Sequence, residues 1–128
     1  MLAKYPCSAV LPATDLERAK KFYSEKLGLE PMKDMDMEGM LILQTGEGTK
    51  LVVYTTAPSK AVHTQAGFDV DDLDAVIDEL AGKGVKMEQY DMPELKTDAK
   101  GIVTWGNVRS AWFKDSEGNT LVLNEVKM

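Results

Sequence analysis

The chain of 128 residues contains a single cysteine and a single histidine, so several kinds of site have few candidate residues. One cysteine cannot form an internal disulfide, and this favours a reducing compartment. No run of 18 apolar residues is present, so we expect no membrane-spanning helix. The first residues lack the charged start and the apolar core of a signal peptide. We therefore expect a soluble protein in the cytoplasm.

Positive charge is also scarce, with 15 Lys and Arg against 21 Asp and Glu and a net charge of −6. No basic stripe is available to displace counterions from phosphates, so nucleic acid is not an expected partner. The apolar share of 44% and the charged share of 28% are typical of a globular protein. At this length, we expect residues 1–128 to form a single domain.

The two halves of the sequence resemble each other. Residues 8–16 align with residues 65–73 at an offset of 57, and residues 48–53 align with residues 118–123 at an offset of 70 (65 − 8 and 118 − 48). The larger second offset reflects a longer loop in the second half. An internal repeat of this kind predicts two copies of one structural unit, about 4–58 and about 62–128.

Apolar periodicity and turn residues predict the order βαβββ in each copy. The expected strands lie at 5–11, 29–36, 40–45, 51–56, 63–70, 85–92, 108–114 and 120–126, and the expected helices at 14–27 and about 72–83. Thr14 is the expected N-cap of the first helix, because Glu17 three residues later completes a capping box. The fold class is therefore α+β, with two tandem βαβββ modules whose helices pack on one side of curved antiparallel sheets.

Three segments in this order, 15–23 with Leu27 and Gly28, then 70–74, then 115–119, are similar to the vicinal oxygen chelate superfamily. That superfamily contains glyoxalase I, extradiol dioxygenases, fosfomycin-resistance enzymes and bleomycin-resistance proteins. The resemblance implies that each module contributes half of an open, barrel-like cleft that holds the ligand.

The resemblance also implies a divalent cation, held by inward-pointing residues on the first and last strand of each module. Those positions are occupied here by Ser8, Val52, Gln65 and Val122. Valine has no lone pair to donate, and serine is a poor ligand for Zn²⁺, Ni²⁺ or Fe²⁺. We therefore expect no metal and no other cofactor. A site displaced to His63 and Gln65 is the alternative.

The residues expected to line the cleft and contact a ligand are Tyr54, His63, Gln65, Trp105, Arg109, Trp112 and Asn124. Either Trp112 or Phe113 must face inward, because neighbours on a strand alternate. Trp105 precedes a glycine in an expected loop, and it can form a stacking wall for a planar ligand, with Arg109 as the partner of an anionic group. His63 is either a solvated side chain or a proton donor at the rim.

Cysteine and methionine have simpler interpretations. Cys7 is expected to be a buried, inert thiol that faces away from the cleft. The methionines at 32, 35, 37 and 40 form either an edge-strand packing surface or an adaptable wall over an apolar ligand. Copper binding is disfavoured, because acidic residues and a lysine interleave with them.

Three functions follow. The first is a metal-independent small-molecule binding protein that holds a planar, partly apolar ligand in a cleft formed across a homodimer, as bleomycin-resistance proteins imply. The second is a metal-dependent lyase of the glyoxalase type or a dioxygenase, whose ligands are displaced from the expected positions. The third is a metal-free enzyme that uses His63, Gln65 or Tyr54 for proton transfer. The sequence does not identify the ligand.

Overall fold

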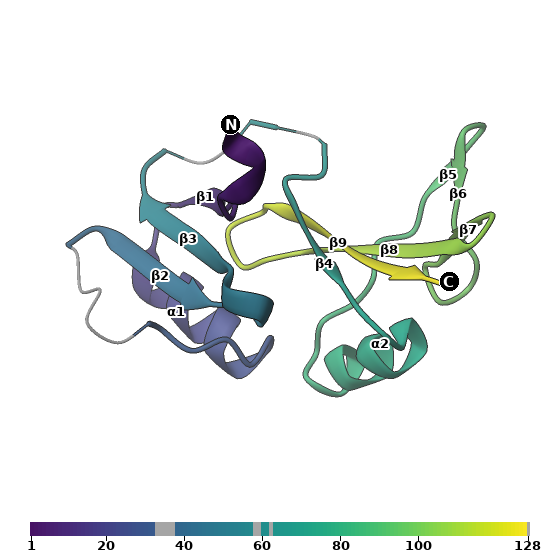
Figure 1. Ribbon diagram of the computed structural model, residues 1–128. Helices are drawn as coiled ribbons and strands as arrows, with labels where there is room; N and C mark the ends of the chain where they lie inside the picture. Colours follow the sequence, from purple (N-terminus) through teal and green to yellow (C-terminus); the bar gives the residue numbers. More distant parts are fainter. Residues whose placement is uncertain (33–37, 58–59, 62, 128) are drawn as a thin grey trace. The chain divides into compact units, whose positions relative to one another are not determined.

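The computed structural model describes residues 1–32, 38–57, 60–61 and 63–127. The chain divides into two compact units (Figure 1). Unit 1 comprises Met1–Ala61 with Asp115–Asn119, and unit 2 comprises Val62–Lys114 with Thr120–Met128. Within the described residues each unit has one α-helix and one main sheet, so the α+β class is confirmed. No helix in these residues is long and apolar enough to span a membrane.

The described residues of unit 1 form a three-stranded sheet, one helix and two short 3-10 turns. Its elements are η1 (Leu2–Lys4), β1 (Ala9–Ala13), α1 (Leu16–Glu25), β2 (Met40–Gln44), η2 (Gly46–Gly48) and β3 (Lys50–Thr55). The strand order is β1-β3-β2. Of the strand expected at 29–36, the described residues show only a bridge from Pro31 to Leu43, and residues 33–36 lie outside the described part of the chain.

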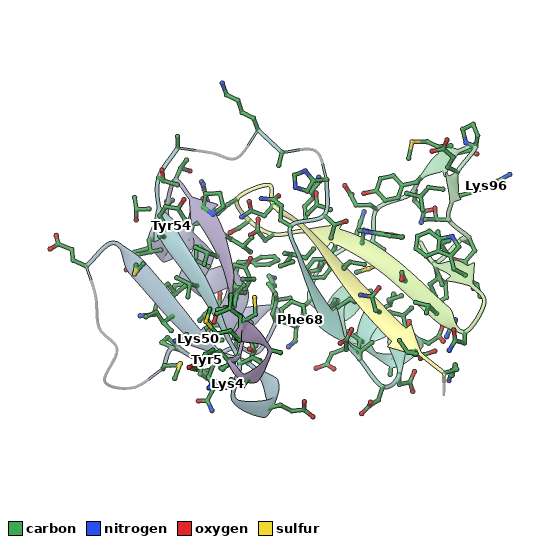
Figure 2. All side chains as sticks on the ribbon, turned by 45° about the horizontal axis from the view of Figure 1, so that its top comes forward. Lys4, Tyr5, Lys50, Tyr54, Phe68 and Lys96 are labelled. Carbon is green, nitrogen blue, oxygen red and sulfur yellow. The ribbon has the colours of Figure 1, made fainter. Side chains whose placement is uncertain are left out.

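Unit 2 repeats this plan with a longer insertion between its helix and its last strands. Its elements are β4 (Ala66–Asp69), α2 (Leu73–Gly82), β5 (Asp91–Met92), β6 (Leu95–Lys96), β7 (Val103–Trp105), β8 (Val108–Lys114) and β9 (Thr120–Val126). The strand order is β4-β9-β8-β7, and β5 and β6 form a separate hairpin, on which Figure 2 labels Lys96. The expected strand at 85–92 is wrong except for its last two residues, and the sequence patterns missed β7.

The sheets are mixed, whereas the sequence predicted antiparallel sheets. In unit 1, β1 pairs with β3 in parallel, and in unit 2, β4 pairs with β9 in parallel. The remaining pairs in both sheets are antiparallel. Each parallel pair joins the first and last strand of its unit, and the connection between them, which contains a helix and further strands, is long enough for parallel pairing.

The core of each unit lies between its sheet and its helix. The fully or nearly buried sheet residues on this side are Leu11, Ala13, Leu41, Leu43, Leu51 and Val53 in unit 1 and Ala111, Phe113, Leu121 and Leu123 in unit 2. They face Ala19 and Tyr23 of α1 and Leu73, Ile77 and Leu80 of α2, respectively. Burying each large apolar side chain contributes about 2 kcal/mol to the free energy of folding. We call the opposite side of each sheet, which carries no helix, the open face.

A buried polar network stabilises unit 1. The Tyr23 hydroxyl donates to Asp115 Oδ2 over 2.6 Å, and Asn119 Nδ2 donates to the same oxygen and to the Pro12 carbonyl. Burial, together with the nearby Asp115 carboxylate, raises the pKa of Tyr23 far above its ordinary value. The tyrosine therefore remains protonated and acts as a hydrogen-bond donor to the carboxylate.

Both helices begin in the same way. Asp15 and Asp72, which lie 57 residues apart, each accept a backbone hydrogen bond three residues later, from Arg18 and Ala75. The expected cap at Thr14 is wrong. Its backbone N–H and its hydroxyl both donate to the carboxylate of Glu117 instead, so it is not available to the helix.

Glu117 reinforces the start of α1. Its carboxylate also accepts the Asp15 backbone N–H and two hydrogen bonds from Arg18, at 2.7 and 2.9 Å. The Glu117 side chain is only 2% exposed, whereas that of Arg18 is 52% exposed. The pKa of Glu117 lies at about 2, below its ordinary 4.5, chiefly because of the hydrogen bonds from Arg18.

This geometry predicts a pH-dependent stability for the Glu117→Gln variant. A carboxylate whose pKa is lowered in the folded state stabilises the fold at pH values above its ordinary pKa. This stabilisation is lost as the pH falls towards the pKa of the folded state. We expect the variant to unfold at lower urea concentration than the wild type at pH 7. The difference should shrink between pH 4.5 and pH 2. Urea titrations across this range test the prediction, and a difference that is constant with pH would contradict it.

Candidate functional site

The strand register of unit 2 places most of the expected ligand-contacting residues on one surface. Trp112 pairs with Val122, and Ser110 pairs with Asn124, between β8 and β9. Because paired residues lie on the same side of a sheet, these four side chains share the open face of unit 2. The same alternation places Val103 and Trp105 of β7 and Gly67 and Asp69 of β4 on that face.

Three aromatic rings meet on the open face of unit 2. Trp112 lies 6.0 Å from Trp105 and 5.8 Å from Tyr90 between ring centroids, and both contacts are edge-to-face. Trp112 is 8% exposed and its indole N–H donates to Thr64 Oγ1 over 3.0 Å, whereas Trp105 is 51% exposed. We call these three rings the aromatic cluster. Its inner ring is fixed by neighbours and its outer ring is available to a ligand.

Trp105 differs from its expected environment in one respect. The sequence suggested a loop, but Trp105 is the last residue of β7 and pairs with Val108. Half of its surface remains exposed in spite of this pairing. Trp112 faces the open side and Phe113 lies in the core, which resolves the alternative that alternation left open.

Polar groups lie beside the aromatic cluster. Ser110 is buried, and its hydroxyl donates to Asn124 Oδ1 over 2.7 Å. At the end of the face where β4 begins, Gln65 Oε1 accepts the backbone N–H of Thr120 over 3.2 Å. His63 precedes β4 and is exposed. Gln65 and Asn124 thus lie on or next to the same surface as Trp112.

Arg109 does not lie on this surface. It pairs with Glu125 across β8 and β9, on the side of the sheet that carries α2. Its Nη1 donates to Asp74 Oδ2 over 2.9 Å and to Glu125 Oε1 over 3.2 Å. Hydrogen bonds from Arg109 and then Lys100 hold the pKa of Asp74 at about 2, well below its usual range. The expectation that Arg109 partners an anionic group beside the tryptophans is therefore wrong, because the sheet separates them.

The expected residues of unit 1 lie on its own open face. Val52 and Tyr54 alternate with the core positions of β3, and Ser8 precedes β1 by one residue. Tyr54, labelled in Figure 2, pairs with Met40 of β2. Of the methionine group, Met32 and Met40 are described and are partly buried, while Met35 and Met37 lie outside the described residues.

The donor set does not fit a transition-metal ion. Val52 is 8% exposed and lies in register with two apolar side chains, Val10 and Ile42. Val122 likewise offers no donor, and the Gln65 carbonyl oxygen already accepts a backbone hydrogen bond. In the described part of the chain, no group of three His, Cys, Asp or Glu side chains is positioned to hold a metal. Of the four family positions, only Gln65 thus carries a plausible ligand for Zn²⁺ or Fe²⁺, and one such ligand cannot hold the ion.

Two further features differ from the sequence interpretation. Cys7 is exposed and not buried, because it lies before β1 begins and has no strand to pack it into the core. Tyr90, which contributes a ring to the aromatic cluster, was not among the residues expected to contact a ligand. Tyr90 lies in an irregular stretch, and the backbone hydrogen bond from the Glu88 N–H to the Trp112 carbonyl holds that stretch against β8.

Comparison with known proteins identifies a family and a set of similar structures. The family model of the Glyoxalase/Bleomycin resistance protein/Dioxygenase superfamily matches residues 8–123. TnmS3, an antibiotic binding protein from Streptomyces sp. CB03234, is 26% identical, with a TM-score of 0.71 over 99% of each chain. A glyoxalase/bleomycin resistance protein from Catenulispora acidiphila DSM 44928 is 26% identical, with a TM-score of 0.68 over 95% of this chain and 98% of that chain.

A more distant structure shares the fold alone. Lactoylglutathione lyase from Agrobacterium tumefaciens is 20% identical, with a TM-score of 0.72 over 98% of this chain and 96% of that chain. No curated protein matches the chain.

The position of Arg109 predicts a structural role. Glu125 is 2% exposed and also accepts the Leu73 backbone N–H, so Arg109 helps to hold the start of α2 on the sheet. We expect Arg109→Met to lower the urea midpoint of unfolding, because it leaves a buried carboxylate with fewer donors. Binding of an aromatic ligand measured well below that midpoint should be unchanged. A variant that loses binding at full stability would contradict this assignment.

Proposed function

The chain belongs to the Glyoxalase/Bleomycin resistance protein/Dioxygenase superfamily, and from that premise we propose that it is a metal-independent protein that binds a planar, partly apolar small molecule on the open face of unit 2. The observation that carries this proposal is the aromatic cluster. It has a half-exposed Trp105 against an almost buried Trp112, on a surface that also carries Asn124.

Stacking is the interaction that this cluster offers. A large ring left half exposed loses the hydrophobic stabilisation that burial would give, and a planar ligand placed against it recovers that stabilisation. Trp112 is already held by Tyr90 and by Thr64, so it restricts where Trp105 can lie. Because this surface is already formed, its side chains lose little conformational entropy when a ligand binds.

The side chains at the family's metal positions support a function that does not depend on a metal ion. Val52 and Val122 are apolar, and they suit contact with an apolar ligand better than coordination. A metal-dependent lyase or dioxygenase requires oxygen, nitrogen or sulfur donors at or near these positions. Such an enzyme remains the competing interpretation, and metal binding by the purified protein would favour it.

The similar proteins are consistent with this choice. One of them is described as an antibiotic binding protein, and its 26% identity extends over nearly the whole of both chains. If this chain binds a ligand of a similar class, it is a protein that sequesters a small molecule. The homodimer and the cytoplasmic location expected from the sequence stay predictions.

Replacing Trp105 tests the proposal. The probes are 2-naphthol, which is planar, and 2-decalol, its saturated counterpart, both followed by ligand-observed NMR. We expect the wild type to bind 2-naphthol in preference, and Trp105→Ala to weaken that binding about tenfold, since one stacking contact is lost. Tyr5→Ala is the matched control, because Tyr5 is an exposed ring of unit 1. Equal binding of both probes, or equal loss in both variants, would overturn the proposal.

A further inference from the structure

The open face of unit 2 carries a polar pair that stacking does not use. Asp69 of β4 and Asn124 of β9 are register partners, so their side chains lie side by side on this face. Asn124 is also the register partner of Ser110, which precedes Trp112 by two residues on β8. The polar pair is therefore next to the aromatic cluster. Asp69 is exposed and Asn124 is partly exposed, so both are accessible to a ligand that lies on the open face of unit 2.

The orientation of the Asn124 amide is fixed. Ser110 is 1% exposed, and its hydroxyl donates to Asn124 Oδ1 over 2.7 Å. The amide oxygen is thus engaged on the β8 side, and Nδ2 points to the β4 side, where it lies 3.6 Å from the position of a Cβ on Gly67. Asn124 therefore offers N–H donors, and the carboxylate of Asp69 beside it offers acceptors.

Gly67 leaves the surface next to Asp69 and Asn124 without a projecting side chain. A Cβ at Gly67 would lie 2.7 Å from Val122 Cγ1, closer than two carbon atoms can approach. The absence of a side chain lets Val122 lean against the β4 backbone and leaves no projecting group between Val122 and Asn124. A flat ring can lie on this floor with its edge directed at Asp69 and Asn124.

We propose that Asp69 and Asn124 recognise the amide or lactam edge of the bound ligand. Asn124 Nδ2 donates to the ligand's carbonyl oxygen, and the Asp69 carboxylate accepts its N–H. The paired strands lie about 5 Å apart, which suits two parallel hydrogen bonds to neighbouring atoms of one planar group. This inference rests on the proposed function, because it names the polar chemistry of the ligand bound on the open face of unit 2.

A pair of probes that differ by one hydrogen-bond donor tests the inference. 2-Quinolinone has both the carbonyl and the N–H, and N-methyl-2-quinolinone has only the carbonyl. We expect the full-length wild type to bind 2-quinolinone about fivefold more tightly, by ligand-observed NMR, because one charge-assisted hydrogen bond separates the probes. Asp69→Ala should remove this preference. Asp71→Ala is the matched control, since Asp71 is also an exposed aspartate but lies beyond β4, and it should keep the preference.

A second variant addresses the carbonyl. Asn124→Leu should weaken both quinolinones to the affinity of quinoline, which has no carbonyl oxygen, and circular dichroism checks that it folds. The inference is overturned if the wild type does not distinguish the two quinolinones, or if Asp69→Ala and Asp71→Ala behave alike. If all three probes bind equally and Trp105→Ala abolishes their binding, the inference fails and the proposed function stands. If none of the probes binds, both fail.

Discussion

The pairing register of the last strand of unit 2 is the constraint on which the rest of that unit depends. β9 pairs with β4 on one side and with β8 on the other, so its alternation assigns side chains from three strands to one face or the other. Val122 and Asn124 face the open side, whereas Leu123 and Glu125 face α2. A slip of one residue would exchange the two sets and would bury Asn124 in the core.

The two faces of this sheet therefore have separate roles. The side that carries α2 combines apolar packing with an ion-pair group in which Arg109 joins Asp74 to Glu125. The open side has few fixed charges among its central residues and exposes a large ring at Trp105. The proposed function therefore places recognition on the surface opposite to the packing against α2.

The sequence predicted the strands of the repeat better than the surroundings of individual residues. The bounds of β8 and β9 match the expected ranges 108–114 and 120–126, because apolar alternation and a turn between them are local signals. Arg109 was misplaced because the sequence does not say which side of a strand faces the helix. Tyr90 was missed because its ring reaches Trp112 through an irregular segment, and no periodic pattern encodes that contact.

The most direct test of the metal-independent function is the metal content of the purified protein after exposure to Zn²⁺, Ni²⁺, Mn²⁺ and Fe²⁺ and removal of the excess. A metal-independent protein should hold no metal above background, because valine stands at two of the four family positions and Gln65 accepts a hydrogen bond from the backbone of Thr120. Near-stoichiometric metal that is lost in Gln65→Ala would contradict the metal-independent function, and it would indicate an enzyme that takes its ligands from other residues.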